Sequence, residues 1–394
     1  MFSPVELAAM HQYGVTPPVV TPRMLEYARL RYVFLFTGLI YTWVSLFLVL
    51  QTGLAAKMRQ WCESITSRLK PAGTLLRIPM YLAMLVFVLA VLRLPYSWYV
   101  SFHNEHAFNL THQSFISWLG DFVKDELVYA VELAVGWGVA FFAYLKFPRR
   151  WPLALWALMT PLIAFVIFVY PLIVDPLFNK YEPMPPSPLH TSIEKLAAES
   201  GIPNAPVFVV DKSRQTDKLN AEVTGLGSSA RVVVWDTTLN KLPEDQVLAI
   251  IGHELGHYAL GHVLIGFALS VVALLVGLMV LGLAFEPLVK RLPRRWGVQS
   301  PADLAVVPAL MLLFSVLGFF GEPIDNGISR LIEHQADAFG LQITGNRAAM
   351  ARTFVSLARE NLSDPDPPAF IQFWFFSHPS LRERIDFALG ITNK

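Results

Sequence analysis

Long apolar runs alternate with shorter polar segments along this chain. A membrane span needs about 20 apolar residues to cross a hydrocarbon core of about 30 Å. The pattern predicts six transmembrane helices, at residues 32–55, 77–99, 127–146, 151–174, 263–285 and 303–321. Glu132 interrupts the third run, so its side chain is expected to face the protein interior or water, or else to extend toward the membrane surface.

Two polar segments, near 175–262 and 322–394, lie outside these runs. In the first, "TSIEKLAAESG" predicts a helix with a capping box at Thr191 and Glu194. "PVFVVD" and "ARVVVWDTT" are β-rich runs typical of a small sheet. "LPEDQVLAIIGHELGH" predicts a further helix that continues into the fifth span.

The expected fold is therefore a mainly α, polytopic membrane protein with about six transmembrane helices and a small β-sheet. We expect an N-terminal membrane domain (1–174) with four spans. A second domain (175–394) would contain the remaining two spans, at 263–285 and 303–321.

Composition supports a membrane protein, because 15% of the residues are charged whereas soluble domains contain about 25%. The net charge of +1 leaves no basic excess for nucleic acid, so no such partner is expected. Cys62 is the only cysteine, which excludes an internal disulfide and a Cys-rich metal site. We expect it to be a packed residue rather than a nucleophile.

The helix predicted before the fifth span carries the pattern H-E-x-x-H at His253, Glu254 and His257. Residues four apart on a helix point in nearly the same direction, so two imidazoles can share one zinc ion. Glu254 then lies beside the ion as a general base. The alternative is a pair of surface histidines without a metal.

A third ligand must come from elsewhere. His262 follows His257 by five residues, whereas the metzincin pattern requires six. A better candidate is Glu333 in "SRLIEHQADAFG", which can complete a gluzincin-type site for one zinc ion with the fourth position open to water. Asp337, one turn later, can orient a ligand histidine through its other ring nitrogen. Because consecutive spans run antiparallel, both ligand segments are expected at the same membrane face.

These motifs, together with "DPLFNKYEPMP", "LNAEVTGLGSSARVVVWDTTL" and "FSHPSLRERID", resemble the type I CAAX prenyl proteases, a family of multispanning zinc metalloproteases. The resemblance covers most of the chain from about residue 77. It implies a zinc endopeptidase in which the two histidines and Glu333 bind zinc and Glu254 activates water. His378 would stabilise the developing oxyanion. Asn220 would hold the substrate backbone beside "ARVVVWD", to which an extended peptide could add as a strand.

The chain departs from the eukaryotic members of the family, which have seven spans and in some cases a long charged insertion before the zinc helix. Its compact form resembles bacterial relatives, whose hosts generally lack prenylated CAAX proteins. We therefore expect a protease of the bacterial plasma membrane that hydrolyses peptide or protein substrates, membrane-associated or lipidated ones among them, and we do not expect processing of a prenylated C-terminus to be its role.

Two alternative functions remain at this point. One is a membrane-protein quality-control protease without prenyl specificity. The other is a transporter or sensor with structural zinc. Glu254 argues against the second, since a structural zinc site has four protein ligands and needs no base.

Positive charges flanking the spans indicate which side the site faces, because Lys and Arg in short loops tend to remain cytoplasmic. The side opposite the zinc motifs carries most of them: Lys57, Arg59, Arg68, Lys70, Arg77, Lys146, Arg149, Arg150, Lys290, Arg291, Arg294 and Arg295. The zinc side has Arg23, Arg29, Arg31 and Lys124. This distribution predicts an extracytoplasmic active site, whereas the family resemblance implies a cytoplasmic one.

Overall fold

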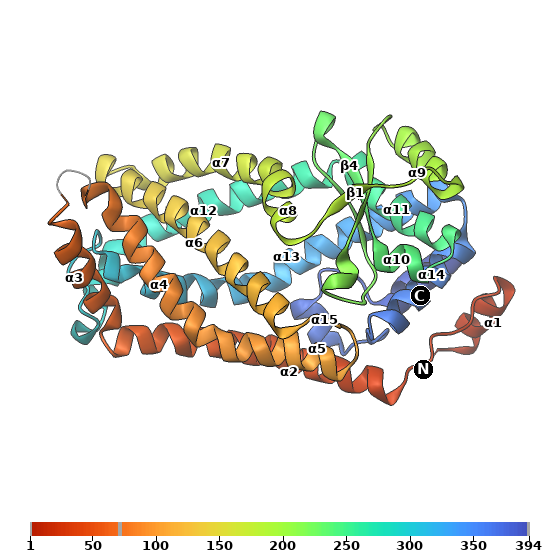
Figure 1. Ribbon diagram of the computed structural model, residues 1–394, viewed down its shortest axis with the longest axis horizontal. Helices are drawn as coiled ribbons and strands as arrows, with labels where there is room; N and C mark the ends of the chain where they lie inside the picture. Colours follow the sequence, from red (N-terminus) through yellow and green to blue (C-terminus); the bar gives the residue numbers. More distant parts are fainter. Residues whose placement is uncertain (1, 70–72, 392–394) are drawn as a thin grey trace.

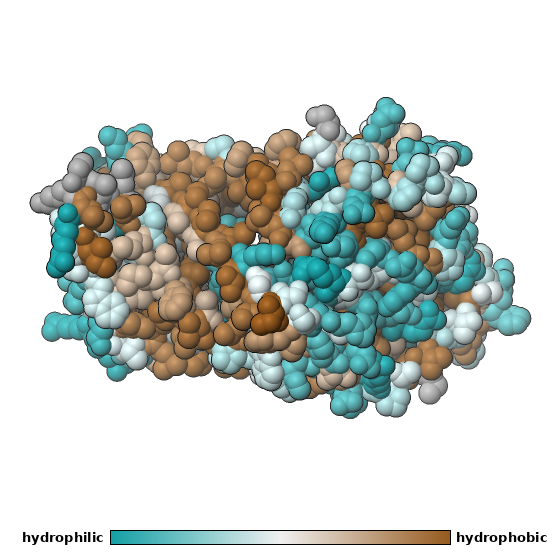
Figure 2. Space-filling model, in the orientation of Figure 1, coloured by the Kyte–Doolittle hydropathy of each residue, from teal (hydrophilic) through white to brown (hydrophobic). Residues whose placement is uncertain are grey.

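The computed structural model of the protein describes residues 2–69 and 73–391. The molecule is elongated, with long helices at one end and the sheet with its shorter helices at the other (Figure 1). Figure 2 shows the matching division of its surface, which is apolar over the long helices and polar over the sheet-containing end.

Six helical rods are long and apolar enough to cross a membrane, which confirms the predicted number of spans: Pro22–Gln51, Leu76–Ala107, Phe115–Lys146, Trp151–Phe178, His262–Arg291 and Leu304–Thr344. The chain is a multi-pass membrane protein. The last rod continues well beyond the predicted run 303–321, because "SRLIEHQADAFG" prolongs the same helix.

Two of these rods are composite. The second joins α4 (Gly73–Ser97) to α5 (Asn104–Ala107) through a π-helical stretch at Trp98–His103. The fourth joins α7 (Trp151–Val169) to α8 (Asp175–Phe178) through a π-helical stretch at Tyr170–Val174. The other rods are α2 (Pro22–Gln51), α6 (Phe115–Lys146), α12 (His262–Arg291) and α13 (Val307–Thr344), the last preceded by a 3₁₀ turn at Leu304–Val306.

The rods form an open ring in which each packs against the next, in the order α13, α2, α4, α6, α7 and α12. The remaining helices are α1 (Pro4–Gln12), α3 (Leu54–Thr66), α9 (Pro188–Glu199), α10 (Asp236–Lys241), α11 (Glu244–Ala259), α14 (Arg347–Glu360), α15 (Ala369–Phe375) and α16 (Leu381–Leu389). Short 3₁₀ turns occupy Lys212–Arg214, Gly227–Ser229 and Arg294–Trp296.

The predicted sheet has four strands: β1 (Tyr181–Pro183), β2 (Val207–Val210), β3 (Ala221–Thr224) and β4 (Arg231–Trp235). Their order is β1-β2-β4-β3, with β2 and β4 parallel and the two outer pairs antiparallel. The expectation that a peptide adds to "ARVVVWD" is therefore wrong, because β4 has a neighbour on each side and both of its edges are already hydrogen-bonded. Strand β3 is an edge strand.

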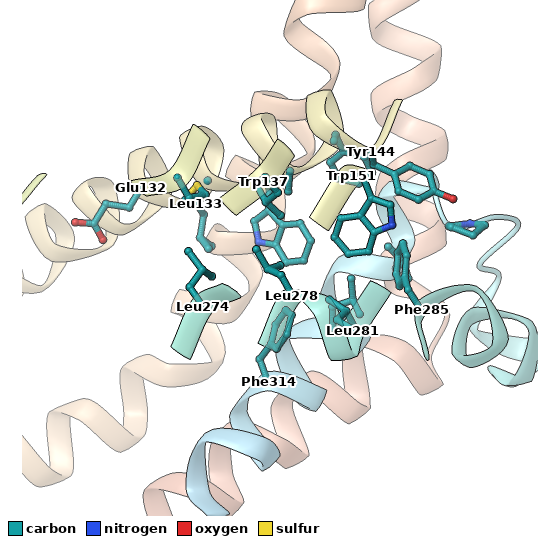
Figure 3. Close-up of a pocket in the computed structure, with 18 residues that line it drawn as sticks. Glu132, Leu133, Trp137, Tyr144, Trp151, Leu274, Leu278, Leu281, Phe285 and Phe314 are labelled. Atoms are coloured by element: carbon teal, nitrogen blue, oxygen red, sulfur yellow. The ribbon is translucent and has the colours of Figure 1, made fainter. Parts of the chain in front are cut away.

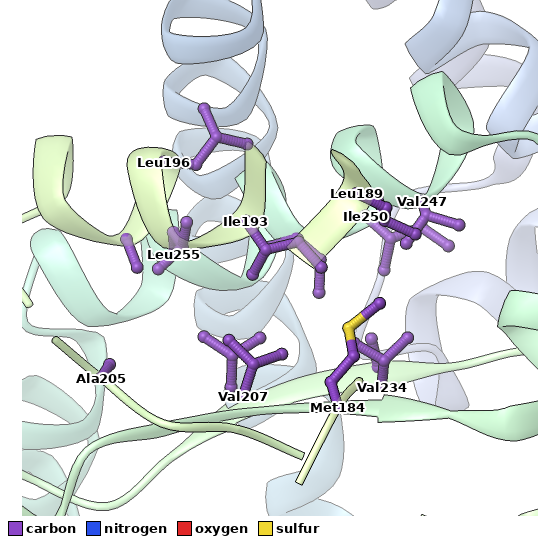
Figure 4. Close-up of a cluster of buried hydrophobic side chains, with 14 of the residues drawn as sticks. Met184, Leu189, Ile193, Leu196, Ala205, Val207, Val234, Val247, Ile250 and Leu255 are labelled. Carbon is purple, nitrogen blue, oxygen red and sulfur yellow. The ribbon is translucent and has the colours of Figure 1, made fainter. Parts of the chain in front are cut away.

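A compact apolar core joins this sheet to α9 and α11 (Figure 4). Ile193 of α9, Val234 of β4 and Leu255 of α11 are fully buried in it. The predicted capping box at Thr191 is wrong. Helix α9 begins one turn earlier, because Pro188 suits the first helical position and Ser187 caps the helix by accepting a hydrogen bond from His190 N at 3.0 Å.

At the opposite end, a cavity of about 260 Å³ lies among α6, α7, α12 and α13. Figure 3 shows Trp137 and Trp151 beside it, and shows the Glu132 carboxylate directed away from these rings. Glu132 is exposed at the protein surface and lies at the edge of the cavity, so it is not packed in the protein interior.

Cys62 lies on α3 and is fully buried. Its thiol donates a hydrogen bond to the Arg77 carbonyl with an Sγ–O distance of 3.1 Å, and burial raises its pKa. Since the thiolate is the reactive form, these surroundings agree with a packed residue rather than a nucleophile.

Candidate metal centre

The zinc motifs lie on two helices, α11 and α13, whose backbones approach very closely. Gly252 and Gly256 of α11 face Ala336 and Gly340 of α13. A Cβ atom added at Gly340 would lie 2.8 Å from the backbone nitrogen of His253, well inside normal contact distance. Small residues spaced by four allow such an approach, and it brings side chains from the two helices within reach of one metal ion.

Helix α11 begins at Glu244, with Pro243 as its N-cap rather than its first helical residue, and Glu244 and Asp245 lie in the first turn, where the helix dipole favours negative charge. Its predicted continuation into the fifth span is wrong. The chain breaks at Gly261, whose φ of +68° is left-handed, and α12 starts afresh at His262. Glycine adopts this conformation without the steric cost that other residues incur.

Three candidate ligands converge as predicted: His253, His257 and Glu333. The two Nε2 atoms are 3.2 Å apart. His253 Nε2 lies 3.2 Å from Glu333 Oε2, and His257 Nε2 lies 3.3 Å from Glu333 Oε1. Tetrahedral zinc with ligand bonds of about 2.0–2.1 Å requires ligand atoms about 3.3 Å apart, so the donor set has suitable spacing and chemistry for this ion.

Hydrogen bonding gives a second reason to place a cation here. His253 Nδ1 lies 2.8 Å from Asp337 Oδ1, and a carboxylate only accepts, so Nδ1 carries a hydrogen. In a neutral ring the Nε2 lone pair would face the buried Glu333 Oε2 at 3.2 Å, a contact that is favourable only when a proton or a cation lies between the two atoms. Burial acts to lower the pKa of His253, but the Asp337 and Glu333 carboxylates outweigh it and raise this pKa to about 9. Without a metal ion, the site therefore retains a proton.

A side chain not assigned from the sequence supports Asp337. Arg384 of α16 donates through Nε to Asp337 Oδ2 at 2.9 Å and through Nη2 to Oδ1 at 2.6 Å. Both residues are buried, and such two-pronged pairs fix orientation. Arg384 lies in "FSHPSLRERID", but that motif gives no indication of which of its charged residues turns inward.

His257 is held by a different, uncharged chain of contacts. Its Nδ1 lies 3.0 Å from His262 Nδ1, and His262 Nε2 lies 3.2 Å from Gln335 Oε1. On an unbroken helix, residues five apart would point about 140° away from each other. The break at Gly261 removes that restriction, so His262 contacts the candidate ligand His257 and is not part of the candidate ligand group itself.

Glu254 lines a cavity of about 250 Å³ together with His253, Asn220 and His378. Within the described part of the chain, no hydrogen bond or ion pair reaches its carboxylate. Burial raises its pKa, while His253 and His257 act in the opposite direction. A carboxylate with a raised pKa that faces a cavity is suited to accept and return a proton.

His378 lies on the other side of Glu333. Its Nε2 is 3.2 Å from Glu333 Oε2, and its Nδ1 is 2.9 Å from Ser377 Oγ. Partial burial lowers the pKa of His378, against the opposing effect of the Glu333 carboxylate. The His378 side chain remains 53% exposed, so it can meet a molecule in the cavity.

Asn220 lies immediately before the edge strand β3. Its backbone exchanges hydrogen bonds with the Thr238 hydroxyl, and its Oδ1 accepts from Ala221 N at 2.9 Å. Asn361 was not assigned from the sequence. Its side chain accepts a hydrogen bond from Leu219 N and donates one to Leu219 O, so it binds both backbone groups of the residue before Asn220. Both asparagines line the cavity beside Glu254.

Two family models match the chain. Residues 184–392 match peptidase family M48, and residues 20–180 match the CAAX prenyl protease N-terminal region, which is described as five membrane helices. In this chain the second range contains four of the candidate spans.

Among its relatives, the uncharacterized metalloprotease YhfN of Bacillus subtilis (strain 168) is 34% identical, over 92% of this chain and 84% of that protein. CAAX prenyl protease 1 of Saccharomyces cerevisiae is 26% identical, over 91% and 83% of the two chains. The crystal structure of S. mikatae Ste24p shares the fold with a TM-score of 0.80 at 22% identity, and covers 98% of this chain and 95% of that one.

The first of these family models alone covers more than half of the chain. These findings confirm the resemblance that the sequence motifs indicated. They also favour a hydrolase over a transporter or sensor. The protein is a membrane metalloprotease that belongs to peptidase family M48.

Proposed function

We propose that the protein binds one zinc ion through His253, His257 and Glu333 and hydrolyses peptide bonds in the adjoining cavity. The observation that carries this proposal is the convergence of the two imidazole Nε2 atoms, 3.2 Å apart, on the two oxygens of the Glu333 carboxylate, each 3.2–3.3 Å from one of them, at the junction of α11 and α13. Zinc, when bound, supplies a Lewis acid that polarises a carbonyl and lowers the pKa of water.

Glu254 accepts the proton of the attacking water and returns it to the leaving amine. Its place in the cavity and its raised pKa suit both steps. Asp337, held by Arg384, keeps the hydrogen of His253 on Nδ1 and its Nε2 free for the metal. His262 does the same for His257 by accepting its Nδ1 hydrogen.

His378 stabilises the negative charge that develops on the carbonyl oxygen. Glu333 Oε2, which lies 3.2 Å from His378 Nε2, can only accept, so the neutral ring carries its hydrogen on Nε2, the atom that faces the site, and its Nδ1 is free to accept from the Ser377 hydroxyl. One such hydrogen-bond donor typically contributes about 3 kcal/mol to transition-state stabilisation.

The substrate is an extended peptide that pairs with the outer edge of β3. Main-chain hydrogen bonding to an exposed strand edge is a general mode of peptide recognition. Strand β3 packs against α11, and Asn220 at its start lines the cavity with Glu254. The bonds between Asn361 and Leu219 hold this strand entrance in place.

Substrate class is tested with purified protein and two peptides of one sequence, with and without a prenyl group, alongside an unfolded membrane protein. We expect zinc-dependent cleavage of the peptides without an absolute requirement for the prenyl group. Cleavage of the prenylated peptide alone would assign prenyl specificity. Degradation of only the unfolded protein would instead assign a quality-control role.

We propose that the protein lies in the bacterial plasma membrane. From the charge distribution, we propose that its active site faces the extracytoplasmic side. Lys70, one of the charges counted, lies outside the described residues. A cysteine for labelling must be accessible to the reagent. Thr238 in α10 is buried and therefore unsuitable, whereas Asn240 in the same helix is exposed and provides a labelling site. An Asn240→Cys, Cys62→Ser protein should react with a membrane-impermeant thiol reagent in intact cells; labelling only after lysis would place the site in the cytoplasm.

A further inference from the structure

The segment that carries His378 is fastened at both ends to α13, the helix that carries Glu333. On its C-terminal side, Ser380 caps α16, and Arg384 of that helix binds Asp337. On its N-terminal side, Arg330 of α13 donates through Nη1 to the carbonyl of Phe376 at 2.7 Å. Arg330, Glu333 and Asp337 are spaced by three and four residues, so they share one helix face.

Arg330 also donates to the carbonyl of Gln372 at 3.1 Å, so it binds the C-terminal end of α15, where a positive charge is favourable. Within residues 2–69 and 73–391 its guanidinium forms no ion pair. The two carbonyls are therefore its principal partners. Gln372 is in turn linked to α16, because its side chain donates to Glu383 at 2.6 Å.

Two further contacts fasten α15 to the same helix. Pro323 has no backbone N–H, so the Phe319 carbonyl lacks its usual partner within α13, and Trp374 Nε1 donates to it at 3.1 Å. Asn326 Nδ2 donates to the carbonyl of Trp374 at 2.6 Å. The C-terminal half of α15 is thus held to α13 at Gln372 and Trp374, and the bond from Arg330 to the Phe376 carbonyl lies closer to His378 than these contacts.

Arg330 does not line the cavity that contains Glu254 and His378. We propose that Arg330 is a positioning residue, which sets the distance between His378 and Glu333 by holding the Phe376 carbonyl. The proposal rests on the function proposed above, since it assigns His378 to the oxyanion. It predicts that the contribution of Arg330 to turnover passes through His378.

The test is a double-mutant cycle on the purified, zinc-loaded full chain with Arg330→Met and His378→Phe. Arg330→Met should lower kcat about tenfold to a hundredfold, the cost of a small displacement at a reacting centre. KM should stay within about twofold, because ground-state binding is untouched. Zinc per chain should be unchanged. In the His378→Phe background, Arg330→Met should change kcat by less than about twofold, since the residue it positions is already gone.

Arg347→Met is the matched control, because Arg347 Nη1 likewise donates to a carbonyl at a helix end, that of Ala388 in α16 at 3.0 Å. It should leave kcat within about twofold of wild type. Hydrogen exchange provides a readout independent of activity: the backbone amides of Ser377, His378 and Ser380 should exchange faster in Arg330→Met and at the wild-type rate in Arg347→Met. Arg330→Lys, which keeps the charge and a donor, should recover part of kcat.

An equal loss of kcat from Arg330→Met in both backgrounds would overturn the proposal, as would unchanged exchange of the Ser377, His378 and Ser380 amides. The proposed function fails separately, if the wild-type protein shows no zinc-dependent cleavage or if His378→Phe turns over at the wild-type rate. Loss of zinc or of thermal stability in Arg330→Met alone would assign Arg330 to the fold and also overturn the proposal.

Discussion

Replacing Gly340 by alanine should weaken metal binding without altering any candidate ligand. The added Cβ would lie 2.8 Å from His253 N, 2.9 Å from the Gly252 carbonyl carbon and 3.1 Å from His253 Cα. Carbon atoms in contact normally sit about 3.5–4.0 Å apart. All three atoms belong to the backbone of α11, so no flexible side chain can move aside, and α11 and α13 must separate.

The required separation is roughly 0.6 Å, the shortfall of the 2.9 Å carbon contact from normal packing distance. A zinc site tolerates about 0.2 Å in its ligand distances. Because Glu333 is on α13 and both histidines are on α11, the shift falls directly on the distances between ligands. We expect zinc affinity to fall about tenfold to a hundredfold, as it does when ligand orientation is disturbed, and stability to fall by about 1–3 kcal/mol from overpacking.

The assay is competition for zinc with a chromophoric chelator, together with thermal unfolding, on the purified chain. Gly318→Ala is the matched control, since it is the same substitution in the same helix, and nothing lies within 4 Å of its added Cβ. That variant should bind zinc like wild type and be as stable or slightly more so. Wild-type zinc affinity in Gly340→Ala would refute the view that the helix spacing sets the ligand geometry.

Two further predictions concern the groups around the ligands. His262→Ala removes the acceptor for His257 Nδ1 and should lower zinc affinity about tenfold to a hundredfold. The same competition assay measures this, and an unchanged affinity would show that His262 does not orient His257. Because the metal-free His253 has a pKa of about 9, a proton competes with zinc below that pH, and zinc affinity should weaken by about tenfold for each unit that the pH falls. Titrations at several pH values check this, and an affinity independent of pH would contradict it.

Most of the membrane architecture could be predicted from the sequence, because a span requires a long apolar run whatever its neighbours are. The two candidate ligand histidines could be predicted because H-E-x-x-H follows helical spacing, which is a local property, and Glu333 because its helix follows the sixth span and so lies at the same membrane face. The structure brings these side chains together at 3.2–3.3 Å. Strands β2 and β4 could likewise be predicted from short β-branched runs, whereas β1 and β3 were not predicted.

Features that depend on contacts between distant segments could not be predicted. Nothing local in β4 indicates that β2 and β3 occupy its two edges, so the strand available to a peptide was misassigned. The break at Gly261 depends on a backbone conformation that glycine permits but does not require, and the role of His262 depends on that break. Arg384 and Arg330 resemble ordinary surface charges until α16 and α15 are packed against α13.

We propose that His253, His257 and Glu333 hold a zinc ion and that Glu254 serves as the base for hydrolysis beside it. The most direct test measures zinc per chain and peptide turnover side by side for wild type, Glu254→Gln and Glu333→Ala. We predict one zinc per chain in the first two, a turnover about 10²- to 10⁴-fold lower in Glu254→Gln, and loss of both zinc and turnover in Glu333→Ala. Wild-type turnover in Glu254→Gln, or full zinc occupancy in Glu333→Ala, would contradict the claim.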